Sequence, residues 1–226
     1  MSVSFSKMSY AYYDVTKESY NTKDTRSQAV GDYEYNQEDS TDRLAVYKND
    51  HKKVILLGMR GTKGSKDWLS NLNILTGRQH NDPDYQYDEE TFLKLKREHP
   101  DYQIVATGHS RGGDRARYLT HKYKDLKAVT YDAASGPTAI FEKIKCGIME
   151  FFTSTSPCQR VVNLSASADP VSVLSKYGLS GDNTTLVDVD ASGMVDAHGL
   201  DKLAKAHSEN PDSFSTIVQN KLGVDF

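Results

Sequence analysis

Cysteine is scarce in this chain of 226 residues. Only Cys146 and Cys158 are present, and their spacing is not typical of metal ligands. They could pair in an oxidising compartment, but we expect two reduced, partly buried thiols. Neither stands in a glycine-rich turn or beside a histidine, which argues against a cysteine nucleophile.

Long hydrophobic runs are absent as well. The longest, Val54–Met59, is far too short to span a bilayer. Residues 1–20 are polar and tyrosine-rich and lack the basic start and apolar core of a signal peptide, so we expect a cytoplasmic protein. The net charge of −3 gives no electrostatic case for nucleic acid or an anionic membrane as the main partner.

Segments rich in proline, glycine or serine that would mark a linker are also missing. The length and composition fit one soluble globular domain over residues 1–226. Its first part, residues 1–41, is set apart by tyrosines among Asp, Ser, Thr and Lys. We expect this part to wrap a core formed by residues 42–205. An arm that faces a partner protein through residues 1–40 is the alternative.

From residue 42 onward, apolar runs alternate with segments of helical character. The runs at 43–47 and 53–61 flank the turn-forming sequence KNDHK and predict a β-hairpin. The alternation that follows predicts an α/β fold with a largely parallel sheet. Further strands are predicted within 102–108, 126–137, 160–170 and 183–190, and helices within 88–101, 111–124 and 140–152 and after residue 198.

The chemistry is most visible in Gly108-His109-Ser110-Arg111-Gly112, which has the form G-x-S-x-G between a predicted strand and a predicted helix. In this context a serine stands on a sharp turn, and the two glycines allow strand and helix to approach closely. The backbone N–H of Arg111 would then face the reacting oxygen. The alternative is a glycine-rich turn without reactivity.

A nucleophilic serine needs a histidine base. Downstream of Ser110 the chain offers His121, His198 and His207. His121 is expected inside the helix after the turn, where it would point away from Ser110. His207 is expected on a solvent-exposed helix surface. His198 precedes a predicted helix in a loop that can reach over the sheet edge, so we predict it as the base. Its alternative is a helix-start residue bonded to backbone.

The base in turn needs an orienting acid. Asp169 directly follows a predicted strand, and Pro170 stops that strand from continuing. We therefore predict Asp169 as the acid. Asp132, at the end of the preceding strand, is the second choice, ahead of Asp188, Asp190 and Asp196.

Four pieces of the chain resemble the class 3 lipases, an α/β-hydrolase family of fungal triacylglycerol lipases and their plant and viral relatives. The resemblance covers about residues 42–205 and keeps the family's order. The pieces are "VILLGMRGT" with "KDWLSNL" just downstream, "IVATGHSRGG", "NLSASADPVSVL" and "AHGLDKL".

The resemblance implies an α/β-hydrolase fold with a mainly parallel central sheet. It implies Ser110 as nucleophile, Asp169 as acid and His198 as base, with Thr62 and Arg111 at the oxyanion hole. It places a lid at residues 63–73, where an apolar helix face would open onto lipid. Ordinary core packing is the alternative for that face, which is formed by Trp68, Leu69, Leu72 and Leu75.

The resemblance further implies a serine carboxylic-ester hydrolase of the lipase or esterase type. It would act on a lipid or smaller acyl ester without a metal or other cofactor, with at most transient contact with a lipid surface. Phospholipase, thioesterase and peptidase activities remain open. So does a non-catalytic interaction protein that retains the hydrolase scaffold.

Two features depart from the family pattern. Arg111 stands where the family usually has leucine, and charged residues follow it, so we expect the charged side of this helix to face solvent or a partner. The stretch between Gly61 and the serine turn is short, which speaks against a deep cleft for long acyl chains.

Overall fold

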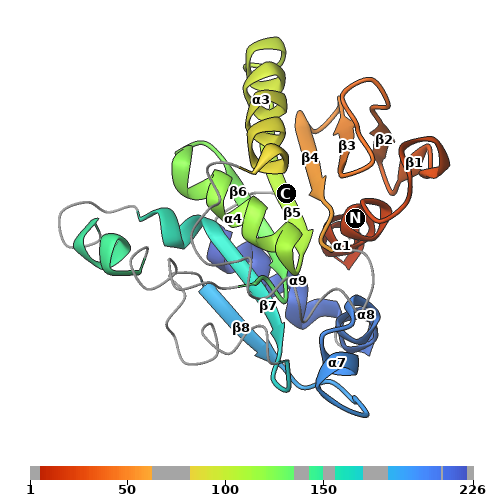
Figure 1. The fold of residues 1–226 in the computed structure, drawn as a ribbon, viewed down its shortest axis with the longest axis vertical. Helices are drawn as coiled ribbons and strands as arrows, with labels where there is room; N and C mark the ends of the chain where they lie inside the picture. Colours follow the sequence, from red (N-terminus) through yellow and green to blue (C-terminus); the bar gives the residue numbers. More distant parts are fainter. Residues whose placement is uncertain are drawn as a thin grey trace, which may run out of the picture.

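The computed structural model describes residues 6–62, 82–134, 143–149, 156–169, 183–209 and 211–222. Within these residues, eight strands form one sheet (Figure 1). Each strand lies beside the strand that precedes it in the chain. The strands are β1 (Ala29–Val30), β2 (Tyr33–Tyr35), β3 (Leu44–Asn49), β4 (Val54–Met59), β5 (Gln103–His109), β6 (Lys127–Tyr131), β7 (Val161–Ala166) and β8 (Asn183–Val187).

The sheet is antiparallel in its first half and parallel in its second. Strands β1 to β4 pair antiparallel, and β3 and β4 form the hairpin predicted around KNDHK. Strands β4 to β8 pair parallel. The predicted α/β fold with a largely parallel sheet is therefore confirmed. The carboxyl ends of the parallel strands meet at one edge, where active sites of such sheets are found.

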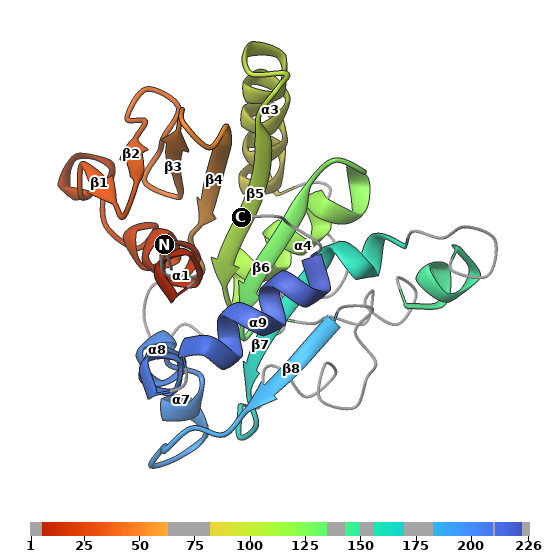
Figure 2. The same cartoon turned by 180° about the vertical axis from the view of Figure 1, so that it is seen from behind.

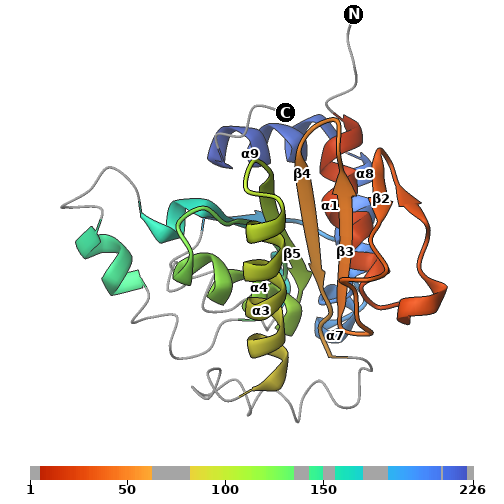
Figure 3. The ribbon, with the colours of Figure 1, turned by 90° about the horizontal axis from the view of Figure 1, so that it is seen from above.

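Helices cover both faces of the sheet (Figures 2 and 3). One face carries α1 (Ser6–Glu18), α8 (Leu200–Glu209) and α9 (Pro211–Leu222), and the other carries α3 (Pro83–Glu98) and α4 (Arg111–Lys122). Shorter helical segments are η1 (Lys23–Thr25), η4 (Pro157–Arg160), α7 (Met194–Ala197) and residues 143–149. No helix in the described part of the chain is long and apolar enough to cross a membrane.

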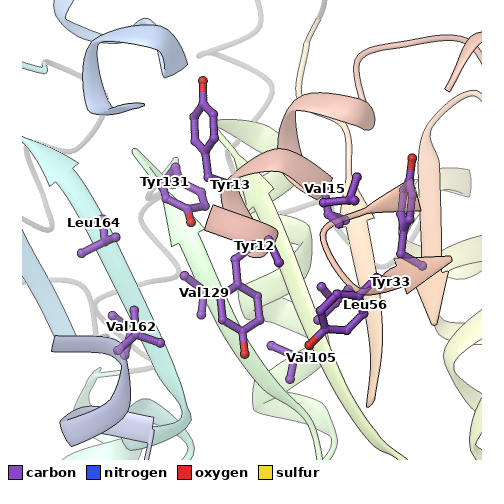
Figure 4. Packing of buried hydrophobic residues seen from close by; sticks show 14 of the residues in the cluster. Tyr12, Tyr13, Val15, Tyr33, Leu56, Val105, Val129, Tyr131, Val162 and Leu164 are labelled. Carbon is purple, nitrogen blue, oxygen red and sulfur yellow. The ribbon is translucent and has the colours of Figure 1, made fainter. Parts of the chain in front are cut away.

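Alternating strand residues build a core on each face, as the two-residue period of a strand requires. Leu56 and Val105 pack toward α1, whereas Leu57 and Ala106 pack toward α3 and α4. Figure 4 shows the first core, where Tyr12, Tyr13 and Val15 of α1 lie over the strands. The tyrosine-rich start of the chain thus supplies buried rings to the fold.

Helix α3 begins five residues earlier than expected from sequence. Its N-cap is Asp82, whose side chain accepts a hydrogen bond from the backbone N–H of Asp84, and Pro83 follows at the first position. Both are favoured at helix starts, because the first N–H groups have no partner within the helix. The start of α3 therefore lies beside the serine turn rather than one turn further on.

Three charged residues of α4, Asp114, Arg115 and Arg117, are buried, so the expectation that the charged side of this helix faces solvent or a partner is wrong for them. Arg115 is 1% exposed and binds Asp88 of α3 through two hydrogen bonds of 2.7 and 2.6 Å. Arg117 pairs with Asp114, which also accepts a 2.6 Å hydrogen bond from the Tyr85 hydroxyl. Helix α3 covers this side of α4 and supplies the opposite charges that burial of a cation demands.

The two cysteines form a disulfide, which corrects the expectation of free thiols. Cys146, in the helical segment 143–149, bonds Cys158 of η4, and both are buried. Their Cα atoms are 6.0 Å apart, within the range that a disulfide bridges. The sequence spacing alone could not show this proximity, because it arises from the return of the chain toward β7.

Removing one partner of the buried Arg115–Asp88 pair should destabilise the fold strongly. Asp88→Ala leaves a buried guanidinium without its carboxylate, and we expect a loss of about 3–5 kcal/mol in the free energy of unfolding. Asp125→Ala, which removes the exposed pair with Lys96, should cost less than about 1 kcal/mol. Urea unfolding of both variants measures the difference, and equal losses would contradict the assigned burial.

Candidate functional site

Ser110 occupies a strained turn between β5 and α4. Its backbone lies at φ 56° and ψ −125°, a region that residues with a side chain rarely adopt. Its N–H donates to the carbonyl of Tyr131, and its own carbonyl accepts from the N–H groups of Asp114 and Ala134, each at 3.1 Å. The surrounding backbone therefore fixes the serine in this conformation.

The flanking glycines are required by close contact. A Cβ atom on Gly112 would lie 2.0 Å from the carbonyl oxygen of Met59 at the end of β4. One on Gly108 would lie 2.5 Å from the backbone of Gly112. Real Cβ atoms do not approach other atoms so closely. The G-x-S-x-G pattern is thus explained by the packing of β4, β5 and α4, as the sequence predicted.

The chain that leaves β4 runs directly past this serine. The Cβ position of Gly61 is 2.6 Å from the carbonyl oxygen of His109 and 3.4 Å from Cβ of Ser110. Thr62, half-buried, is the next residue. The structure therefore brings the segment predicted for the oxyanion hole next to the serine turn, whose Arg111 opens α4.

The side chain of Arg111 is held by α3. Its guanidinium donates to Asp84 at 2.9 Å and also pairs with Asp82, both at the start of α3. Arg111, which departs from the family pattern, thus connects the serine turn to the start of α3. Its backbone N–H, at the start of α4, is the group that the sequence prediction assigns to the oxyanion hole.

The predicted base and acid meet. His198 lies just after α7 and Asp169 just after β7, and the Nδ1 atom of His198 is 3.0 Å from Oδ1 of Asp169. Both residues are buried. A carboxylate only accepts, so Nδ1 carries the proton, and the neutral ring then has its lone pair on Nε2. This is the tautomer that a general base needs.

A second histidine, which the sequence analysis did not single out, lies next to the base. His109, the residue before Ser110, lies with its ring centre 4.7 Å from that of His198. Its Nε2 is 2.8 Å from the carbonyl oxygen of His198, and its Nδ1 is 2.9 Å from the Tyr20 hydroxyl. Burial, and then the repulsion that a protonated His198 would exert, lower the pKa of His109 to about 3, so it is neutral.

Asp132, the second choice for the acid, lies against Asp169. Its backbone φ is 44°, and its Oδ1 accepts from the Ser165 hydroxyl at 3.0 Å and the Ala166 N–H at 2.8 Å. Burial, and then the neighbouring charge of Asp169, raise the pKa of Asp132 well above its usual range. Burial and the neighbouring carboxylate thus favour the neutral form of Asp132, which lies behind the hydrogen-bonded His198–Asp169 pair.

His109, Asp132 and His198 lie close enough to suggest a metal site, with one possible ligand atom from each within 4.8 Å of the others. Their chemistry does not fit one. His109 already uses one ring nitrogen as donor and the other as acceptor, and the raised pKa of Asp132 disfavours its charged form. A bound cation would need deprotonated ligands with free lone pairs.

The expected lid lies outside the described residues. Trp68, Leu69, Leu72 and Leu75 all belong to residues 63–81. Their predicted contact with an acyl chain stays a prediction.

The pKa of His109 predicts a loss of stability in mild acid. The unfolded chain binds a proton at His109 below about pH 6.5, and the folded chain does not, so stability falls as pH falls. Between about pH 6.5 and 5 the contribution is about 2 kcal/mol. His109→Gln should remove this part of the slope, while Tyr20, His198, Asp132 and Asp169, the titratable groups around the ring, remain. Parallel stability curves for variant and wild type would contradict the assignment.

The glycine contacts predict a sharp difference between two substitutions. Gly112→Ala should lower the free energy of unfolding by more than about 3 kcal/mol or prevent folding, because strand backbone fills the space that its Cβ needs. Gly147→Ala meets nothing within 4 Å in a helical segment and should be neutral or slightly stabilising. Thermal unfolding of the two variants compares them, and a stable, wild-type-like Gly112→Ala would refute the packing.

No family model matches the chain. Solved structures with a similar fold include a triacylglycerol lipase whose catalytic centre is a serine protease triad (TM-score 0.51, 17% identity, covering 76% of this chain and 75% of that one). They also include Lip2 lipase from Yarrowia lipolytica (0.50, 16%, 83% and 81%) and a mutant form of MDLA from Penicillium cyclopium (0.53, 12%, 84% and 80%). The resemblance to class 3 lipases is thus confirmed for the fold, and the chain has the α/β-hydrolase fold.

Proposed function

We propose that this protein is a serine hydrolase that cleaves carboxylic esters. The observation that carries the proposal is the buried hydrogen bond between His198 and Asp169, which fixes the base tautomer beside the strained turn of Ser110. The fold similarity to fungal lipases supports the same class. Neither support depends on the residues of the expected lid.

In the proposed mechanism, Nε2 of His198 takes the proton of Ser110 Oγ as that oxygen attacks the ester carbonyl. Asp169 stabilises the imidazolium that forms. The backbone N–H of Arg111 and the backbone N–H and hydroxyl of Thr62 bind the oxyanion, and such donors typically contribute a few kcal/mol each. His198 then protonates the leaving alcohol, and water repeats the sequence on the acyl-enzyme to release the acid. The proposal needs no cofactor.

The substrate class follows from the fold neighbours. Since one of them is named as a triacylglycerol lipase, we propose a lipid or smaller acyl ester as substrate. Trp68, Leu69 and Leu72 would contact its acyl chain. An acyl-length and head-group screen separates lipase from phospholipase, thioesterase and peptidase activity.

The non-catalytic alternative drew support from two features that the structure explains otherwise. Tyr12 and Tyr13 of α1 lie in the core, and Arg111 and Arg115 of α4 pair with carboxylates of α3 instead of being displayed. We therefore favour the enzyme.

A fluorophosphonate probe tests the proposal without requiring a known substrate. The wild-type protein should gain one covalent adduct in intact mass, and Ser110→Ala should gain none. Ser110→Ala and His198→Ala should each reduce ester turnover by several orders of magnitude. Ser208→Ala, which removes an exposed serine, should behave as wild type.

Detergent is included in a parallel sample so that a closed lid cannot hide the serine. An adduct that persists in Ser110→Ala would overturn the assignment of the nucleophile. A folded wild-type protein that gains no adduct in either sample would favour the non-catalytic reading.

A further inference from the structure

We infer that Tyr20 is a positioning residue of this site, and that its hydroxyl joins the oxyanion segment to the catalytic base through His109. The inference rests on the proposed function, because the role of His198 as catalytic base is part of that proposal. It assigns a role to the tyrosine-rich start of the chain beyond filling the core. Tyr20 lies just after α1, in a turn closed by a hydrogen bond from its N–H to the carbonyl of Lys17.

The direction of each hydrogen bond follows from chemistry. The carbonyl oxygen of His198 can only accept, so the Nε2 atom of His109, 2.8 Å away, must carry its proton. His109 is neutral, so its Nδ1 has a lone pair and accepts from the Tyr20 hydroxyl at 2.9 Å. The tyrosine oxygen is then left with lone pairs facing inward.

The hydroxyl oxygen of Tyr20 lies next to the backbone of Gly61. Burial raises the pKa of Tyr20, while a hydrogen bond from the Gly61 backbone opposes the rise, as a donor to the phenol oxygen does. A Cβ atom on Gly61 would lie 2.5 Å from this oxygen. The hydroxyl of Tyr20 and the carbonyl oxygen of His109 thus both occupy the space that a side chain at residue 61 would need.

The result is one ordered network, from the Gly61 N–H to Tyr20, from Tyr20 to His109, and from His109 to the carbonyl of His198. Its first member precedes Thr62 and touches the serine turn, and its last is the backbone of the base. The network holds the two groups that flank the serine at a fixed separation. All its members are neutral, so it does this without adding a charge to the site.

A second contact from α1 reaches the same part of the fold. The Tyr13 hydroxyl lies 3.2 Å from Oδ1 of Asp201, near the start of α8 and three residues after His198. Helix α1 also packs on β4 and β5, the strands that lead to Gly61 and His109. Helix α1, which precedes Tyr20, thus contacts both of these strands and the start of α8.

The test is Tyr20→Phe compared with Tyr47→Phe. Each substitution removes one partly buried hydroxyl that donates a hydrogen bond, to His109 in the first case and to the carbonyl of Ser27 in the second, so both variants are expected to fold. Tyr20→Phe should lower kcat by about ten- to a hundredfold with little change in KM, because reacting groups shift relative to each other. Tyr47→Phe should keep the wild-type kcat. Equal kcat in the two variants would overturn the inference.

A readout independent of activity separates this inference from the proposed function. In 15N NMR of the histidine side chains, wild-type His109 should be neutral with the proton on Nε2, and Tyr20→Phe should shift the signal of its Nδ1. If the wild type lacks serine reactivity, the proposed function fails and the network is judged by this spectrum alone. A protonated Nδ1 in the wild type, or an unchanged signal in Tyr20→Phe, would refute it.

Discussion

The site depends on the contact between the end of β4 and the first turn of α4. The carbonyl oxygen of Met59 occupies the space that a side chain on Gly112 would need, and a side chain on Gly108 would likewise meet the backbone of Gly112. This close packing of β4 against α4 holds Ser110 in a strained backbone conformation and places Gly61 beside it. Backbone strain of this kind persists only where the surroundings over-determine it, as the hydrogen bonds to the serine backbone do here.

The segment beside the serine is held from both faces of the sheet. On the α4 side, the guanidinium of Arg115 donates to the carbonyl of Arg60 at 3.0 Å while it pairs with α3. On the α1 side, the hydroxyl of Tyr20 faces the backbone of Gly61. A buried ion pair adds little net stability because both charges lose their hydration. We therefore infer that Arg115 contributes mainly by holding the backbone that leads into Thr62 in place, rather than by adding stability.

The sequence predicts those features of the fold and the site that depend on residues close together in the chain. It does not predict contacts between residues that lie far apart in the chain. The strand–turn–helix around Ser110 and the strand that ends before Asp169 follow from short patterns, because their chemistry is set by neighbours in the chain. Nothing local predicts that Tyr20 meets His109, since 89 positions separate them. The burial of Arg115 is not predicted from sequence for the same reason. The carboxylate that pairs with Arg115 belongs to Asp88 on α3, 27 positions earlier, so the charges of α4 alone indicate a solvent-exposed face.

The order of the strands has a consequence for synthesis on the ribosome. Because each strand pairs with the one before it, the sheet can grow from its first hairpin as the chain emerges, without waiting for distant partners. The reactive constellation cannot form this way, since Ser110 is in place long before His198 has been made. A nascent chain can therefore form the serine turn before the acid and base of the proposed site, Asp169 and His198, have been made, so the proposed hydrolysis would have to wait for the last third of the chain.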